Sequence, residues 1–160
     1  MAAPLTATAI NCSLSAKGRA SSTDAMIAVL AEHFSGQGVK VSEPIRIAAH
    51  RVKWGVSSDE GAGDDWPKIR EQILSADILI FGTPIWMGQA SSVAKLVLER
   101  MDAFLGETDD AGRMPSYSKV AVAAIALALG ELGEQLDAFE LLDGDPAYPG
   151  IFVGLGDGGE

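Results

Sequence analysis

The sequence has only one cysteine, Cys12, and two histidines, His33 and His50, among its 160 residues. A single cysteine excludes a disulfide within the chain, and no group of Cys and His has the spacing of a zinc site. We therefore predict no metal site. A chain of this length also needs none for folding, because it can bury enough surface around one hydrophobic core.

Long hydrophobic runs are missing as well. The longest apolar run, residues 120–129, has about half of the ~20 residues that a membrane-spanning helix requires. The first residues show no basic region followed by an apolar stretch, which a secretory signal would have. We expect a cytoplasmic protein with no membrane partner.

Basic residues are scarce relative to acidic ones. Twelve Lys and Arg stand against 22 Asp and Glu, which gives a formal net charge of -10. Residues 130–160 hold eight of the acidic side chains and no basic one. This balance argues against a nucleic-acid partner. The acidic end is either a solvated surface, which is the usual role of such charge blocks, or a docking surface for a basic partner.

Strand-like and helix-like patterns alternate along the chain, which predicts one domain over residues 1–160 with a parallel sheet. We expect Pro44 to interrupt the second strand and to place it at the edge of the sheet. Residues 53–65 are rich in Gly, Ser and Asp and predict a loop of a length usually tied to function or disorder. The predicted strands are residues 5–12, 39–48, 76–82, 119–129 and 149–156, and the predicted helices are residues 21–36, 64–76, 92–106 and 131–143.

The first loop that could carry chemistry follows the first strand. It is rich in hydroxyl groups and leads into a helix, whose free N–H groups and positive dipole end favour a bound anion such as phosphate. It lacks both the Walker-type GxxxxGK[ST] pattern and the dinucleotide GxGxxG pattern. A second interpretation stays open, because Ser and Thr also precede helices simply as caps. The hydroxyl residues are Ser13, Ser15, Ser21, Ser22 and Thr23.

The second such loop, residues 83–92, follows the most apolar strand. It carries Trp86 and Met87, which suit the face of a flat aromatic ligand, with the backbone amides around Gly88 within reach of ring heteroatoms. Packing of Trp86 on a neighbouring loop or on a second copy of the chain is the alternative. Ser91 and Ser92 are expected to cap the following helix.

Residues 80–104, together with residues 10–23 and 64–86, resemble the NADPH-dependent FMN reductase-like branch of the flavodoxin-like superfamily. The resemblance covers most of residues 7–124. It implies a flavodoxin-like doubly wound parallel sheet with strand order 2-1-3-4-5 in a three-layer α/β/α arrangement. After about residue 126 the chain departs from the family, because no Gly/Asn-rich third flavin loop follows the fourth strand. Two explanations for residues 127–160 are open: natural divergence, or an end produced by an altered reading frame or truncation.

The resemblance also implies the residues that hold FMN. Its phosphate would lie on the first loop, at Ser13, Ser15, Ser21, Ser22 and Thr23, although many members of the family carry a basic residue at the position of Ser15. Its ring would lie along the second loop, at Thr83, Pro84, Ile85, Trp86, Met87 and Gly88.

The implied function is an FMN-dependent oxidoreductase that transfers a hydride from NADPH or NADH to a quinone, a flavin or a similar small-molecule electron acceptor. No catalytic side chain is expected, since the flavin carries the chemistry. We expect Cys12 to be a buried, inert thiol and both histidines to lie at the surface. The alternatives are an FMN electron carrier without reductase activity and a flavin-free binding domain. A homodimer would let the loop Lys53–Asp65, with Trp54, cover the site of the other copy.

Overall fold

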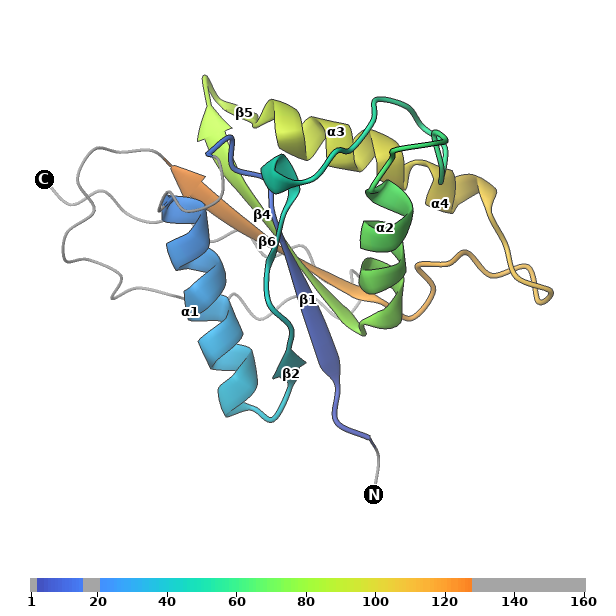
Figure 1. The fold of residues 1–160 in the computed structure, drawn as a ribbon. Helices are drawn as coiled ribbons and strands as arrows, with labels where there is room; N and C mark the ends of the chain where they lie inside the picture. Colours follow the sequence, from blue (N-terminus) through green and yellow to red (C-terminus); the bar gives the residue numbers. More distant parts are fainter. Residues whose placement is uncertain (1–2, 16–20, 128–160) are drawn as a thin grey trace, which may run out of the picture.

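The computed structural model describes residues 3–15 and 21–127, which form a parallel sheet with helices on both faces (Figure 1). The predicted helix at residues 131–143 and the predicted strand at residues 149–156 lie outside the described residues. The strands are β1 (Thr6–Asn11), β2 (Lys40–Val41), β3 (Ile45–Arg46), β4 (Ile78–Trp86), β5 (Gln89–Ala90) and β6 (Val120–Leu127), and the helices are α1 (Ser22–Gly36), η1 (Ile47–Ala49, a 3₁₀ helix), α2 (Trp66–Ser75), α3 (Ser92–Met101) and α4 (Ala103–Gly106).

The order of the parallel strands matches the prediction as far as the described residues extend. β1 pairs with β2 and β3 on one side and with β4 on the other, and β4 pairs with β6. The predicted interruption of the second strand is confirmed, because it is divided into β2 and β3, with Pro44 between them. Proline cannot donate a hydrogen bond to a ladder, so the edge of the sheet tolerates the interruption.

Two hydrophobic clusters cover the two faces of the sheet. β1 shows the division, because Ala7 and Ala9 face α1 whereas Ile10 and Cys12 belong to the cluster with α2 and α3. This alternation follows from the two-residue period of a strand. In Figure 1, α1 lies on one side of the sheet and α2 and α3 lie on the other. The three-layer α/β/α arrangement is therefore confirmed.

Helix α1 approaches the sheet closely at Gly82. A Cβ atom at this position would lie 2.5 Å from Cδ1 of Ile27 and 3.0 Å from Cγ2 of Thr23, so any larger residue would require these side chains to shift. Gly82 is the partner of Asn11 in the β1–β4 pairing. The glycine thus brings the start of α1 against the carboxyl ends of both strands.

Residues 53–65 contain no helix or strand, as predicted, and they form an ordered loop. It folds around Arg100 of α3, whose side chain is fully buried. The Arg100 guanidinium donates hydrogen bonds to the carbonyl oxygens of Lys53 (2.9 Å) and Ser57 (3.1 Å) and to Oδ2 of Asp64 (2.7 Å). Burying a cation requires such a set of acceptors, which explains why this loop takes one conformation.

The Asp64 carboxylate, which pairs with Arg100, is also held by backbone N–H groups. It accepts hydrogen bonds from the backbone N–H groups of Lys53, Glu60 and Trp66 at 3.1–3.2 Å, and its side chain is as fully buried as that of Arg100. Desolvation alone would raise the pKa of this carboxyl group, but these N–H donors and the Arg100 guanidinium lower it to about 2. The pair is therefore fully charged at neutral pH.

We predict that Arg100→Met lowers the free energy of unfolding by about 3–5 kcal/mol, because it leaves a buried carboxylate without its partner. Urea unfolding measures the change. Arg113→Met serves as the control, since it breaks an exposed pair with Asp109 that should contribute at most about 1 kcal/mol. A loss below about 1 kcal/mol for Arg100→Met would show that loop 53–65 does not depend on this ion pair.

Candidate functional site

The carboxyl ends of β1 and β4 lie side by side, which brings the two predicted loops to one edge of the sheet. The register pairs Asn11 with Gly82, so Cys12 and Thr83, where the two predicted loops begin, lie next to each other. In open α/β sheets this edge is where ligands bind. The spatial proximity of the two loops, which sequence order alone does not give, makes a shared site possible.

On the first loop, Ser21 acts as a helix cap. It precedes α1, and its hydroxyl accepts from the N–H of Asp24 (3.2 Å) while Asp24 accepts from the N–H of Ser21 (3.2 Å), which together form a capping box. Ser22 is half-buried in the first turn. The capping interpretation thus holds for Ser21, and Ser22 remains a candidate for ligand binding.

Two further hydroxyl residues of the first loop contact a side chain that we did not predict to be part of the site. Arg46, at the end of β3, donates from Nη1 to the Ser13 hydroxyl (2.9 Å) and to the Ser15 carbonyl oxygen (3.4 Å). Its other terminal nitrogen pairs with the Asp24 carboxylate. A basic residue at the carboxyl end of the strand beside β1 is the signal that could have revealed it. Residues 16–20 of this loop lie outside the described residues.

The charge state of this cluster follows from its hydrogen bonds. Desolvation alone would raise the pKa of Asp24, but hydrogen bonds from Arg46 and Ser21 and the positive charge of Arg46 lower it below its ordinary value. Asp24 is therefore an anion at neutral pH, and it lies at the positive end of α1. The same positive end of the helix would stabilise a bound anion.

The predicted second loop is a β-hairpin, so the strand before it extends beyond the predicted end at residue 82. β4 continues through Trp86, and β5 returns antiparallel to it, with Trp86 opposite Gln89. Met87 (φ 51°) and Gly88 (φ 76°) form the turn. Positive φ at both central residues is the pattern of a type I′ turn, although methionine rarely adopts it.

The hairpin exposes its tip and buries its base. Met87 is 99% exposed and Trp86 is 50% exposed, whereas Thr83 and Pro84 are buried and Ile85 is half-buried. An exposed aromatic ring and thioether at the edge where ligands bind are available to a flat apolar ligand. The outer residues are therefore candidates for direct contact, while Thr83 and Pro84 support them from below.

Thr83 belongs to a buried hydroxyl network centred on Ser91, the cap of α3. The Ser91 hydroxyl donates to the carbonyl oxygen of Cys12 (2.6 Å) and accepts from the N–H of Ala94 (3.0 Å). The N–H of Ser91 donates to the Thr83 hydroxyl (3.2 Å). The network fixes the end of β1, the base of the hairpin and the start of α3 relative to one another.

The donors at this edge fit a phosphate ester that carries an aromatic ring. Among the described residues, Oγ1 of Thr23, in the first turn of α1, is buried and has no hydrogen-bond partner. It lies at the helix end that favours anions, and Arg46 adds a cation beside it. The FMN that the sequence resemblance implies has such a phosphate and such a ring. Ser22, Thr23 and Arg46 would hold the phosphate, and Trp86 and Met87 would contact the ring.

The remaining side chains considered as reactive groups are Cys12, His33 and His50. Burial raises the pKa of the Cys12 thiol to about 12, so it is unreactive as predicted, and both histidines are exposed. Over residues 3–15 and 21–127, no three or more His, Cys, Asp or Glu side chains lie together as metal ligands. No helix in the same ranges is long and apolar enough to cross a membrane.

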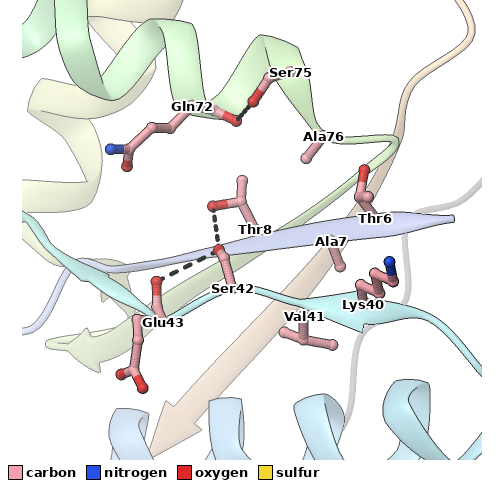
Figure 2. Close-up of a pocket in the computed structure, with 10 residues that line it drawn as sticks. All are labelled: Thr6, Ala7, Thr8, Lys40, Val41, Ser42, Glu43, Gln72, Ser75 and Ala76. Carbon is pink, nitrogen blue, oxygen red and sulfur yellow. Dashed lines mark hydrogen bonds between the residues drawn. The ribbon is translucent and has the colours of Figure 1, made fainter.

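A groove of about 520 Å³ lies elsewhere, along the first half of β1 and the edge strand β2 (Figure 2). Its lining residues include Thr8 and Ser42, whose hydroxyl groups are 3.1 Å apart in a hydrogen bond. None of the predicted site residues lines it. The groove is therefore separate from the candidate site.

Residues 5–143 match the family described as NADPH-dependent FMN reductase. The match extends beyond Leu127 and so includes part of the segment that we expected to differ. The chain is also 29% identical over 126 residues to 8-demethyl-8-aminoriboflavin-5'-phosphate synthase of Streptomyces davaonensis. That alignment covers 73% of this chain but 49% of the synthase, so the chain spans about half the length of this relative.

Two solved structures are similar in fold. RosB with the bound intermediate 8-demethyl-8-formylriboflavin-5'-phosphate superposes with a TM-score of 0.67 at 23% identity, covering 82% of this chain and 67% of RosB. An NAD(P)H:quinone oxidoreductase from Methanothermobacter marburgensis superposes with a TM-score of 0.56 at 16% identity, covering 78% of this chain and 66% of the other. The flavodoxin-like fold is thereby confirmed.

We predict that Ser91→Ala lowers the free energy of unfolding by about 1–3 kcal/mol, because the N–H of Ala94 loses its cap and the buried carbonyl of Cys12 loses its donor. Ser92→Ala is the matched control. Ser92 is exposed in the first turn of the same helix, and its replacement should change stability by less than about 0.5 kcal/mol. Equal effects of the two substitutions in urea unfolding would contradict the central position of Ser91.

Proposed function

Because the chain belongs to the NADPH-dependent FMN reductase family, we propose that it is an FMN-dependent oxidoreductase that passes a hydride from NADPH or NADH to a quinone, a flavin or a similar acceptor. With a quinone, the two electrons of the hydride and one proton from solvent give the hydroquinone and NAD(P)⁺. One observation carries the proposal: an anion-binding helix start and an exposed aromatic hairpin tip lie at the same edge of the sheet.

In this proposal the two loops hold different parts of FMN. We assign the phosphate to the first loop, chiefly to Ser22 and Thr23 at the start of α1, with Ser13 and Ser15 held beside it by Arg46. We assign the ring to the exposed part of the hairpin, Ile85 to Gly88. Bound FMN supplies the hydride chemistry, so the protein needs only to bind and orient it and to leave one ring face open.

We also propose a homodimer in the cytoplasm, with a small molecule as the electron acceptor. Trp54 supports the dimer, since it is 72% exposed on a loop that Arg100 holds in one conformation. A rigid exposed tryptophan is typical of a contact surface. Sedimentation that finds only a monomer at micromolar concentration would remove this part of the proposal.

We predict that Trp86→Ala weakens FMN binding about two- to tenfold, because ring stacking contributes roughly 0.5–1.5 kcal/mol beyond area burial. Ser22→Ala should weaken it about tenfold through loss of a hydrogen bond to a charged phosphate. Quenching of flavin fluorescence measures both. Tyr117→Ala, which removes another exposed aromatic ring, and Ser92→Ala are the controls. Unchanged affinity in both site variants would place the flavin elsewhere.

The reductase activity is tested by rapid mixing of the FMN-loaded protein with NADPH. A reductase bleaches the flavin absorbance directly, and added quinone restores it. Flavin that stays oxidised on mixing but accepts electrons from a one-electron donor would instead indicate an electron carrier. A protein that binds no FMN would indicate a flavin-free binding domain.

The name of the Streptomyces davaonensis relative gives a reason to examine the flavin itself after turnover. That protein is named for making a modified riboflavin phosphate, so a second candidate function uses FMN as a substrate. Chromatography of the flavin recovered from the reaction distinguishes the two. Unaltered FMN supports the reductase, and an altered isoalloxazine supports the second function.

A further inference from the structure

Arg46 reaches the first loop from the neighbouring strand. Because β3 pairs in parallel with β1 and places Arg46 opposite Asn11, the side chain emerges at the edge of the sheet where the loop begins. Its guanidinium contacts the hydroxyl of Ser13, the carbonyl of Ser15 and the carboxylate of Asp24, and only 15% of the side chain is exposed. A nearly buried cation therefore lies against the predicted phosphate loop.

The Asp24 carboxylate occupies the place where an anion would bind. It lies in the first turn of α1, a helix of 15 residues, and accepts from the N–H (3.2 Å) and the hydroxyl (3.0 Å) of Ser21, from the Asn11 amide and from Arg46. Backbone N–H, hydroxyl and guanidinium groups at a helix start are also the donors that bind phosphate oxygens.

A second observation points to a ligand at the same helix start. Thr23 is fully buried, and among the described residues its Oγ1 has no hydrogen-bond partner. Buried hydroxyl groups in native proteins are nearly always hydrogen-bonded. An oxygen of a bound phosphate would supply the missing acceptor.

A bound phosphate would add negative charge next to the Asp24 carboxylate. Arg46 and Asp24 neutralise one another, whereas a phosphate monoester brings about -1.5 to -2 at neutral pH. The Asp24 side chain is 38% exposed, so it can turn toward solvent more easily than the nearly buried Arg46 can. We propose that Arg46 is a ligand of the FMN phosphate and that Asp24 competes with the phosphate for it; this inference rests on the proposed function.

The sign of one substitution separates this role from a purely structural one. If the Asp24–Arg46 pair only stabilised the loop, Asp24→Asn would weaken flavin binding together with the fold. If Asp24 competes with the phosphate, the same substitution removes a like charge and strengthens FMN binding. The Asn side chain keeps an oxygen that can accept from the N–H of Ser21, and the Ser21 hydroxyl still caps α1, so the helix start is retained.

The experiment titrates the purified protein with FMN and with riboflavin, which lacks the phosphate, and follows flavin fluorescence. Arg46→Met should lower the FMN affinity about tenfold or more. Asp24→Asn should raise the FMN affinity about three- to tenfold. Both should leave the riboflavin affinity within about twofold. Asp109→Asn and Arg113→Met alter an exposed Asp–Arg pair on another loop and should change neither affinity.

The outcomes separate this inference from the proposed function. A wild type that binds neither flavin refutes both. A wild type that prefers FMN, with Arg46→Met keeping that preference, refutes the role of Arg46 alone, and weaker FMN binding by Asp24→Asn refutes the competition. Circular dichroism checks that the variants are folded. If Arg46→Met is unfolded, the sign of the Asp24→Asn effect decides, because that variant retains Arg46.

Discussion

The hydrogen bond from the Ser91 hydroxyl to the carbonyl oxygen of Cys12 is the contact on which the site geometry depends. It joins the end of β1 to the start of α3, and the N–H of Ser91 joins both to Thr83 at the base of the hairpin. All three groups are buried, so an unpaired member would carry a desolvation cost. The end of β1 and the base of the hairpin are therefore held together by buried hydrogen bonds of the protein itself.

Much of the fold was predictable because it depends on apolar periodicity. The strands β1, β4 and β6 and the helices α1 and α2 lie where that pattern places them, and the parallel order follows from the alternation of strands and helices. The hairpin was missed because Met87 takes a backbone conformation that normally favours Asn or Gly. The break between α3 and α4 has no comparable signal in the apolar pattern.

The loop of residues 53–65 and the first loop were less predictable, because contacts of two arginines from distant parts of the sequence shape them. Arg100 lies on the inward face of α3 among apolar residues, and the carbonyl oxygens that satisfy it come from residues more than 40 positions away. Arg46 contacts a loop from a different strand for the same reason: it must find acceptors where the sheet ends. Hydropathy patterns treat arginine as a surface residue, so both loops were assigned from composition, which contains no information about these contacts.

A phosphate site lined by donors faces two opposed requirements. Donors left without partners at a buried helix start destabilise the empty protein, whereas donors already paired must lose their partner before a ligand binds. Asp24 meets the first requirement, since it satisfies Arg46 and Ser21 within the chain. The net free energy of phosphate binding is then the difference between the contacts that the donors make with the phosphate and those that they make with Asp24. On this view the acidic residue in the first turn of α1 sets the affinity of the site without contacting the ligand.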